Sequence, residues 1–142
     1  MNFSPEAIKK YQDLKNGFQM EDILKPVLEN KFGELNKTKK YDTFDFINDK
    51  YLIELKTRNA VWGQYPSLMF GANKLNKAKE IKDKDVYFFF KLKDGLYYWK
   101  YKEGEYEINK GGRTDRGKNE ITDCCFINNE YIKNYNDLVL TN

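Results

Sequence analysis

Residues 41–58 read Tyr-Asp-Thr-Phe-Asp-Phe-Ile-Asn-Asp-Lys-Tyr-Leu-Ile-Glu-Leu-Lys-Thr-Arg, and this stretch predicts two short strands joined by a tight turn. Asp45, Glu54 and Lys56 interrupt strand sequence that is otherwise rich in apolar residues. Charged side chains are rarely buried in strands unless they are paired with each other or bind a metal. The pattern therefore predicts a site in which two carboxylates bind a metal beside an ammonium group.

The register of this hairpin decides which side chains share a face. A two-residue turn at Asn48-Asp49 pairs Asp45 with Leu52. Because side chains alternate along a strand, we then expect Asp45, Glu54 and Lys56 to point the same way. The opposite face is apolar and is expected to anchor the hairpin in the core: Phe44, Phe46, Ile53 and Leu55.

The amino-acid composition limits which catalytic groups and metal ligands the chain can use. The chain contains no histidine, which excludes an imidazole base and histidine-ligated metals. The two cysteines, Cys124-Cys125, are adjacent, which suits neither a zinc site nor a disulfide between them. Hydrolysis would then depend on carboxylates, lysine and a hard metal such as Mg²⁺ or Mn²⁺. Asp45 and Glu54 are the expected ligands, the backbone carbonyl of Leu55 completes the set, and Lys56 orients the attacking water or stabilises charge on phosphate.

The element pattern predicts an α/β fold. The chain has 142 residues, 40% of them hydrophobic, so we expect one folded domain spanning residues 1–142. No apolar run reaches the length of a membrane span, so no membrane insertion is expected. Expected helices cover residues 4–16, 18–32, 72–81 and a short segment within 131–140, and expected strands cover 41–47, 50–57, 86–93, 96–102, 105–109 and 121–127, with residues 61–70 irregular. Such an order indicates a central mixed sheet flanked by helices.

The spacing Asp45-x₈-Glu54-x-Lys56, on a hairpin preceded by one helix and followed by another, resembles the PD-(D/E)XK nuclease superfamily. Phe44 stands where the proline of the motif's name would be. The resemblance implies a restriction-endonuclease-like fold with an αβββαβ core and divalent-metal-dependent cleavage of nucleic acid. The many Asn, Lys, Ile and Tyr residues suggest an AT-rich genome, such as that of a virus, a phage or a low-GC bacterium.

Glu21 is a further candidate from a separate element. It lies three residues from Phe18 and from Leu24, on the apolar stripe of its expected helix. In the superfamily the first helix often supplies an extra acidic ligand, and the resemblance implies that role for Glu21. The alternative is a salt bridge at the edge of the core.

Basic residues are candidate nucleic-acid contacts. Arg58 follows the catalytic strand, Lys74 and Lys77 share a face of the following helix, and Arg113 and Arg116 lie in a glycine-bearing loop. Their alternative is a solvated surface. Aromatic residues could stack on bases, although packing within a hairpin is the commoner role of such residues: Tyr65, Tyr97, Tyr98, Trp99 and Tyr101.

Three functional interpretations remain open. The first is a metal-dependent DNA endonuclease, the second a catalytically inactive nucleic-acid-binding module of the same fold, and the third an RNA endonuclease. The net charge of +3 permits nucleic-acid binding without demonstrating it. A small nuclease with one active site often forms a homodimer to cut two strands, but no interface can be read from the sequence. Two cysteines without a disulfide framework favour an intracellular protein, in the cytoplasm or nucleus, of the host cell if the source is viral.

Overall fold

The first helix is longer than the sequence predicts. The computed structural model describes residues 5–38, 44–112 and 121–140. Helix α1 (Pro5–Phe32) runs without a break, so the predicted joint at Gly17 is wrong. A glycine inside a helix costs only about 1 kcal/mol, which the rest of a long helix tolerates. Pro26 removes one helical N–H, but it lies on an exposed side where water can solvate the freed carbonyl.

A six-stranded mixed sheet forms the centre of the molecule. In spatial order its strands are β1 (Asn36–Lys37), β2 (Phe46–Ile47), β3 (Tyr51–Thr57), β5 (Asp85–Leu92), β6 (Gly95–Lys100) and β9 (Lys133–Asn134). Only β3 and β5 pair in parallel, and the connection between them carries helix α2 (Ala72–Glu80). The predicted central mixed sheet flanked by helices is confirmed.

A second, three-stranded sheet was not predicted. It contains β4 (Ser67–Gly71), β8 (Thr122–Asn128) and β7 (Glu107–Gly111), in that spatial order. The expectation that residues 61–70 are irregular is therefore wrong for their second half. Leu68 and Phe70 of β4 are buried with the period of a strand, and β4 pairs with β8 more than fifty residues later.

The C-terminal segment differs from the predicted short helix. It forms two 3₁₀ turns, η1 (Asn129–Tyr131) and η2 (Tyr135–Asp137), on either side of β9. Each turn follows an asparagine, Asn128 or Asn134, whose side chain accepts a hydrogen bond from the backbone N–H two residues on. Asparagine favours such tight local turns over a continued helix.

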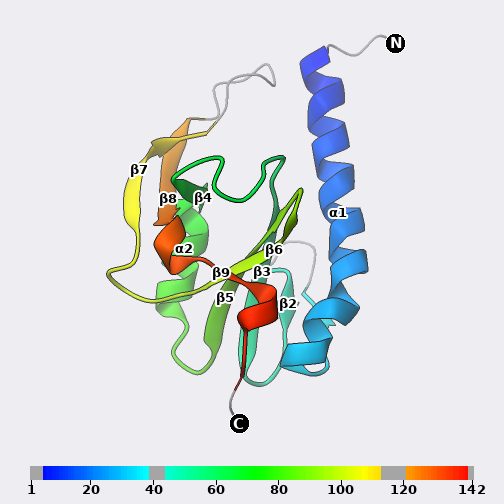
Figure 1. The fold of residues 1–142 in the computed structure, drawn as a ribbon, viewed down its shortest axis with the longest axis vertical. Coiled ribbons are helices and arrows are strands. Elements are labelled where there is room, and N and C mark those ends of the chain that lie inside the picture. Colours follow the sequence, from blue (N-terminus) through cyan, green and yellow to red (C-terminus); the bar gives the residue numbers. More distant parts are fainter. Residues whose placement is uncertain (1–4, 39–43, 113–120, 141–142) are drawn as a thin grey trace.

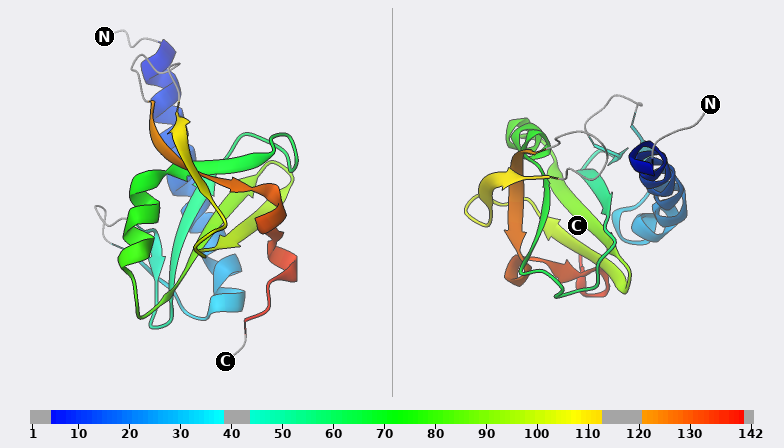
Figure 2. Two further views of the ribbon diagram at one scale, coloured as in Figure 1. Left: turned by 90° about the vertical axis from the view of Figure 1, so that its left-hand side faces the viewer. Right: turned by 90° about the horizontal axis from the view of Figure 1, so that it is seen from above.

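The two faces of the large sheet are covered by different layers. Helix α1 packs on one face, whereas α2 and the small sheet cover the other (Figures 1 and 2). Strand β5 is buried on both faces, since Tyr87 and Phe89 contact the α1 layer while Phe88 and Phe90 contact the other layer. This arrangement explains the three consecutive phenylalanines of β5. It also leaves β3, the neighbour of β5, in reach of residues from both layers.

Candidate active site

The hairpin that carries the motif has a register two residues from the predicted one. Ile47 pairs with Leu52, and the two-residue turn is Asp49-Lys50 instead of Asn48-Asp49. The side-chain oxygen of Asn48 accepts hydrogen bonds from the N–H groups of Lys50 and Tyr51, at 2.9 and 2.8 Å, so Asn48 stands before the turn and caps it. A shift of two residues keeps every side chain of a strand on its original face.

Asp45 is fixed where β2 stops pairing regularly with β3. Its N–H donates to the carbonyl of Ile53 at 2.9 Å, and its own carbonyl accepts from the N–H of Thr38 at 3.0 Å. Its carboxylate accepts a 2.7 Å hydrogen bond from the N–H of Leu55. The side chain of Asp45 therefore occupies the edge of β3 in place of a strand partner.

The bend at residues 44–45 corrects one prediction. Phe44 was expected on the same face as Phe46, but Phe44 packs with Leu52 and Phe88 under the small sheet, whereas Phe46 packs against the α1 layer. The alternation of a regular strand does not hold across the bend. Ile53 and Leu55 do lie on the α1 side, as predicted.

Among residues 19–38, 44–112 and 121–140, whose side chains the structure describes, Glu54 is the only charged residue that is buried. Its side chain is 3% exposed, and its two oxygens lie 3.2 Å from Lys56 Nζ and 3.3 Å from Lys74 Nζ. Burial first, and the nearby charge of Asp45 second, raise the pKa of Glu54 to about 7, while the two lysines oppose that rise. Oxygen Oε2 accepts no hydrogen bond within the described part of the chain, because the Lys74 contact is an ion pair without hydrogen-bond geometry.

Glu21 reaches this group from α1. It lies on the stripe that buries Leu24 and Leu28, and its side chain is 18% exposed. Burial, then a hydrogen bond with Asp45 and the charge of Asp45, raise the pKa of Glu21 to about 8. The structure thus brings together Glu21, Asp45 and Glu54, the three acids that the sequence singled out.

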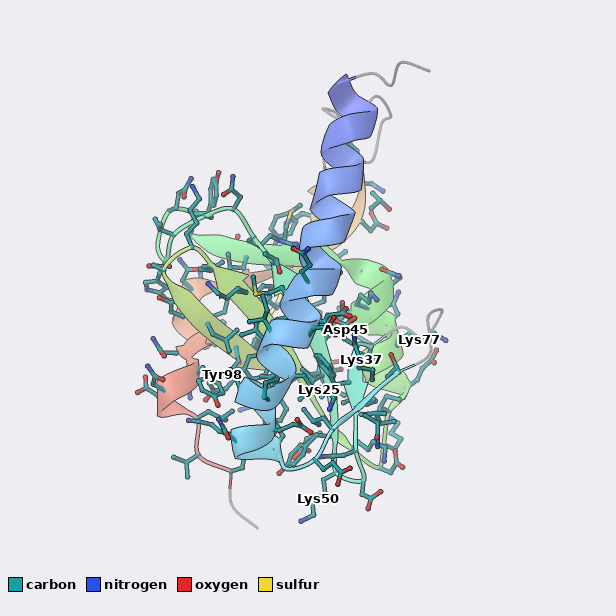
Figure 3. The ribbon with its side chains drawn as sticks, turned by 90° about the vertical axis from the view of Figure 1, so that its right-hand side faces the viewer. Lys25, Lys37, Asp45, Lys50, Lys77 and Tyr98 are labelled. Atoms are coloured by element: carbon teal, nitrogen blue, oxygen red, sulfur yellow. The ribbon has the colours of Figure 1, made fainter. Side chains whose placement is uncertain are left out.

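Lys37 is a neighbour of the site that the sequence did not reveal. It projects from the short edge strand β1, and its Nζ lies 2.6 Å from Asp22 Oδ1 and 3.9 Å from Glu21 Oε2. The hydrogen bond with Asp22 raises the pKa of Lys37. Lys37 belongs to a polar, lysine-rich connection, and nothing in that segment distinguishes it from the other lysines. Figure 3 shows Lys37 next to Asp45, on the same side of α1.

The predicted nucleic-acid contacts separate into four groups. Lys74 belongs to the acid cluster through Glu54, whereas Lys77, one turn later, is exposed and lies 3.6 Å from Glu80. Arg58 is held against β4 by a 2.8 Å hydrogen bond from its Nη2 to the carbonyl of Met69. Arg113 and Arg116 lie outside the described residues.

The donor set fits a hard divalent cation. The carboxyl groups of buried Glu54 and partly buried Glu21, both with raised pKa values, lie around the third acid, Asp45, and one buried oxygen of Glu54 lacks a hydrogen bond, so a cation would relieve both the repulsion and the desolvation. Oxygen ligands of this kind are those that Mg²⁺ and Mn²⁺ prefer. In the described part of the chain, no three acids are arranged so that they could hold one metal ion together. Metal binding therefore requires the acidic side chains to turn towards a common point.

We compared the sequence with models of known protein families. Residues 10–136 match the family described as "Phage putative PDDEXK endonuclease". The chain belongs to this family. The α/β architecture with its mixed sheet is restriction-endonuclease-like, in agreement with this membership. Membership also supports nuclease activity on a nucleic acid. No significant match was found among curated proteins or among solved structures. Among the described residues, no helix is long and apolar enough to cross a membrane.

Proposed function

We propose that this protein is a divalent-metal-dependent endonuclease that hydrolyses phosphodiester bonds in DNA. The observation that carries the proposal is the buried carboxylate of Glu54 on β3. This carboxylate lies between two lysines and close to Asp45. A charged cluster at this depth is costly for folding, which argues for a functional reason to keep it. Membership of a PDDEXK endonuclease family supports the same reaction class.

Four groups of this chain would hold the metal: the carboxylates of Asp45, Glu54 and Glu21 and the backbone carbonyl of Leu55. The N–H of Leu55 points towards Asp45, and the N–H and C=O of one strand residue point to the same edge. The carbonyl of Leu55 therefore faces the edge at which Asp45 lies. A bound Mg²⁺ or Mn²⁺ would polarise the scissile phosphate and lower the pKa of a water molecule.

Lys56 is assigned to the reacting centre. Its ammonium lies 3.2 Å from Glu54 and is 26% exposed, so it is anchored at one end of the site and open to substrate at the other. During hydrolysis the water oxygen bonds to phosphorus as the water loses a proton, the ester P–O bond breaks, and the leaving oxygen takes up a proton, so that the net reaction adds one water molecule. Lys56 orients the water and stabilises the negative charge that develops on the phosphoryl oxygens.

Further cations would hold the DNA backbone. We assign Lys77 and Arg58 to phosphate contacts, and Lys74 to a shared role between Glu54 and phosphate. Arg113 and Arg116 are assigned the same role from sequence. We propose that residues 1–142 act as one domain and that two copies are needed to cut both strands of a duplex.

The test is cleavage of plasmid, branched and single-stranded DNA with Mg²⁺ or Mn²⁺. We expect cleavage by the unmodified protein and a loss of at least about a hundredfold for Glu54→Ala and Lys56→Ala. Lys133→Ala, an exposed change on β9 at the far edge of the sheet, serves as the matched control and should retain full activity.

The outcomes separate the rival functions. Binding of DNA without metal and without turnover would favour a binding module of the same fold. Cleavage of RNA in preference to DNA would favour an RNA endonuclease. Unchanged cleavage by both active-site variants would remove the proposed catalytic residues.

A further inference from the structure

The loop between β3 and β4 displays large apolar side chains to solvent. All six residues from Val61 to Pro66 are exposed, and Val61, Trp62 and Tyr65 are exposed by 44%, 37% and 55%. Within residues 19–38, 44–112 and 121–140, whose side chains the structure describes, Trp62 and Tyr65 are the only exposed aromatic residues. The two lie within four residues of each other. We call residues 61–66 the aromatic loop.

The backbone of the aromatic loop is fixed at both ends. The N–H of Trp62 donates to both carboxylate oxygens of Asp94, at 3.1 and 3.2 Å. Asn129 donates from its side chain to the carbonyl of Tyr65 at 2.6 Å and from its N–H to the carbonyl of Pro66 at 3.1 Å. A surface segment with these contacts is pre-organised, so its side chains lose little entropy when they bind a partner.

Hydrogen bonds and ring packing also fix the tip of the loop. The side-chain oxygen of Gln64 accepts from the N–H of Val61 at 3.1 Å, and the N–H of Gln64 donates to the carbonyl of Val61 at the same distance. The indole of Trp62 stacks on the ring of Tyr97, with centroids 4.5 Å apart and planes 11° apart. The plane of the exposed indole is therefore set before any ligand binds.

The aromatic loop continues the strand that carries the active site. Lys56 on β3 and Arg58 just after β3 precede it, and the carbonyl of Ala60 accepts a hydrogen bond from the N–H of Lys93, in the turn after β5. The five residues from Lys56 to Val61 can span at most roughly 18 Å, so the loop begins within a few nucleotides of Lys56. Lys93, an exposed cation next to Asp94, lies at the base of the loop. Figure 1 shows this connection at the end of the sheet where β3 finishes.

We propose that the aromatic loop binds unpaired bases of the nucleic-acid substrate, by stacking on Trp62 and Tyr65. This inference rests on the proposed nuclease function and names its substrate class as DNA with a single-stranded or branched region. Bases in a duplex are already stacked on each other, whereas unpaired bases offer their faces to aromatic side chains. The neighbouring cations suit the phosphates on either side of such bases.

The experiment measures binding in the presence of a chelator, so that no cleavage occurs. The chain has two tryptophans, and Trp99 is 1% exposed, so a ligand on the loop is reported by the fluorescence of Trp62. We expect an oligothymidylate of about 20 nucleotides to quench this signal, and Trp62→Phe to remove the change. Tyr65→Ala should weaken oligothymidylate binding about tenfold and duplex binding by less than about twofold.

Matched controls separate a lost contact from a lost fold. Val139→Ala removes another apolar side chain, 80% exposed and remote in sequence, and should bind both nucleic acids as the unmodified protein does. Thermal melting of Tyr65→Ala should match that of the parent, because the Tyr65 side chain is largely exposed.

Failure of this inference differs from failure of the proposed nuclease. Cleavage of DNA together with oligothymidylate binding that Tyr65→Ala and Trp62→Ala leave unchanged would overturn the loop assignment and leave the nuclease standing. Loop-dependent binding without any cleavage in Mg²⁺ or Mn²⁺ would support the loop and remove the nuclease. Absence of binding to both nucleic acids would overturn the loop assignment as well.

Discussion

Asp45 combines a structural contact with an electrostatic cost. Its carboxylate accepts the N–H of Leu55, which holds the irregular end of the hairpin. The same charge raises the pKa of both Glu21 and Glu54. A residue that supports the backbone and destabilises its neighbours is expected where the destabilisation serves a ligand.

Asp45→Asn separates these two roles. The amide oxygen still accepts the N–H of Leu55, while the charge is lost. We expect the metal-free protein to melt a few degrees higher at neutral pH, and Mn²⁺ binding to weaken by at least about tenfold. Calorimetry and thermal melting measure both effects. Unchanged Mn²⁺ affinity would remove Asp45 from the ligand set.

The raised pKa values of Glu21 and Glu54 predict how stability depends on pH. Folding raises the pKa of Glu21 from 4.5 to about 8 and that of Glu54 from 4.5 to about 7. Between pH 4.5 and these raised values, the folded state therefore binds more protons than the unfolded state. The stability from these groups is complete below about pH 4.5 and is lost as the pH rises through 7 to 8.

The melting temperature of the metal-free protein should therefore fall by roughly 5 °C between pH 5 and pH 8.5. Saturating Mn²⁺ at pH 8.5 should restore it, because a cation stabilises the charged carboxylates. Glu54→Gln should flatten the dependence, and the same slope in that variant would show that other groups cause it.

At the scale of residues, the sequence predicts the face of a strand on which a side chain lies better than it predicts the residue with which it pairs. Glu54 and Lys56 share a face because they are two apart on a strand, and the structure confirms their contact at 3.2 Å. Asp45 keeps its place near Glu54 despite the wrong register, because the shift is even. Lys37 could not be predicted, since its position depends on an edge strand of two residues that pairs with β2.

At the scale of elements, Asn48 connects the hairpin to α1. Its side-chain oxygen caps the turn, and its side-chain nitrogen donates to the carbonyl of Phe32 at 3.0 Å. The hairpin that carries Asp45 and Glu54 is thereby tied to the end of the helix that carries Glu21. This contact fixes the separation between two parts of the site.

Asn48→Ala removes all of these hydrogen bonds. We expect the free energy of unfolding to fall by about 1–2 kcal/mol, as for the loss of several partly exposed polar contacts. Asp49→Ala, in the exposed turn beside it, is the control and should change stability by less than about 0.5 kcal/mol. Urea denaturation measures both, and equal effects of the two variants would contradict a capping role for Asn48.

The sequence predicts the elements that depend on a local pattern of residues. It does not predict the strands that form only by pairing with a strand far away in the sequence. The Asp94-Gly95 pair and the apolar runs beside it predict a hairpin, and the structure confirms the hairpin of β5 and β6 but not the position of its turn, which is Lys93-Asp94 because Gly95 already pairs with Leu92. Strand β4 follows a breaker-rich segment and depends on β8, where Leu68 pairs with Ile127. Local sequence carries little information about such a long-range pair.

At the scale of the whole molecule, some lysines contact the acids of the site and others are exposed on the surface. Lys37, Lys56 and Lys74 lie against the acids of the site, whereas Lys77 is 56% exposed on the adjoining helix. Its ion pair with Glu80 is exposed on both sides and contributes little to stability. Under the proposed function, we expect Lys77 to contact a phosphate of the substrate.

Lys77→Gln should therefore change the salt dependence of DNA binding more than the fold. Each phosphate contact contributes about 0.9 to the slope of log affinity against log salt concentration, so the slope should fall by roughly that amount. Titrations of duplex DNA at several salt concentrations, with a chelator present, measure it. Lys133→Gln at the far edge of the sheet keeps the same change in net charge and should leave the slope unaltered. Equal losses for both variants would show that net charge, and not a contact made by Lys77, determines binding.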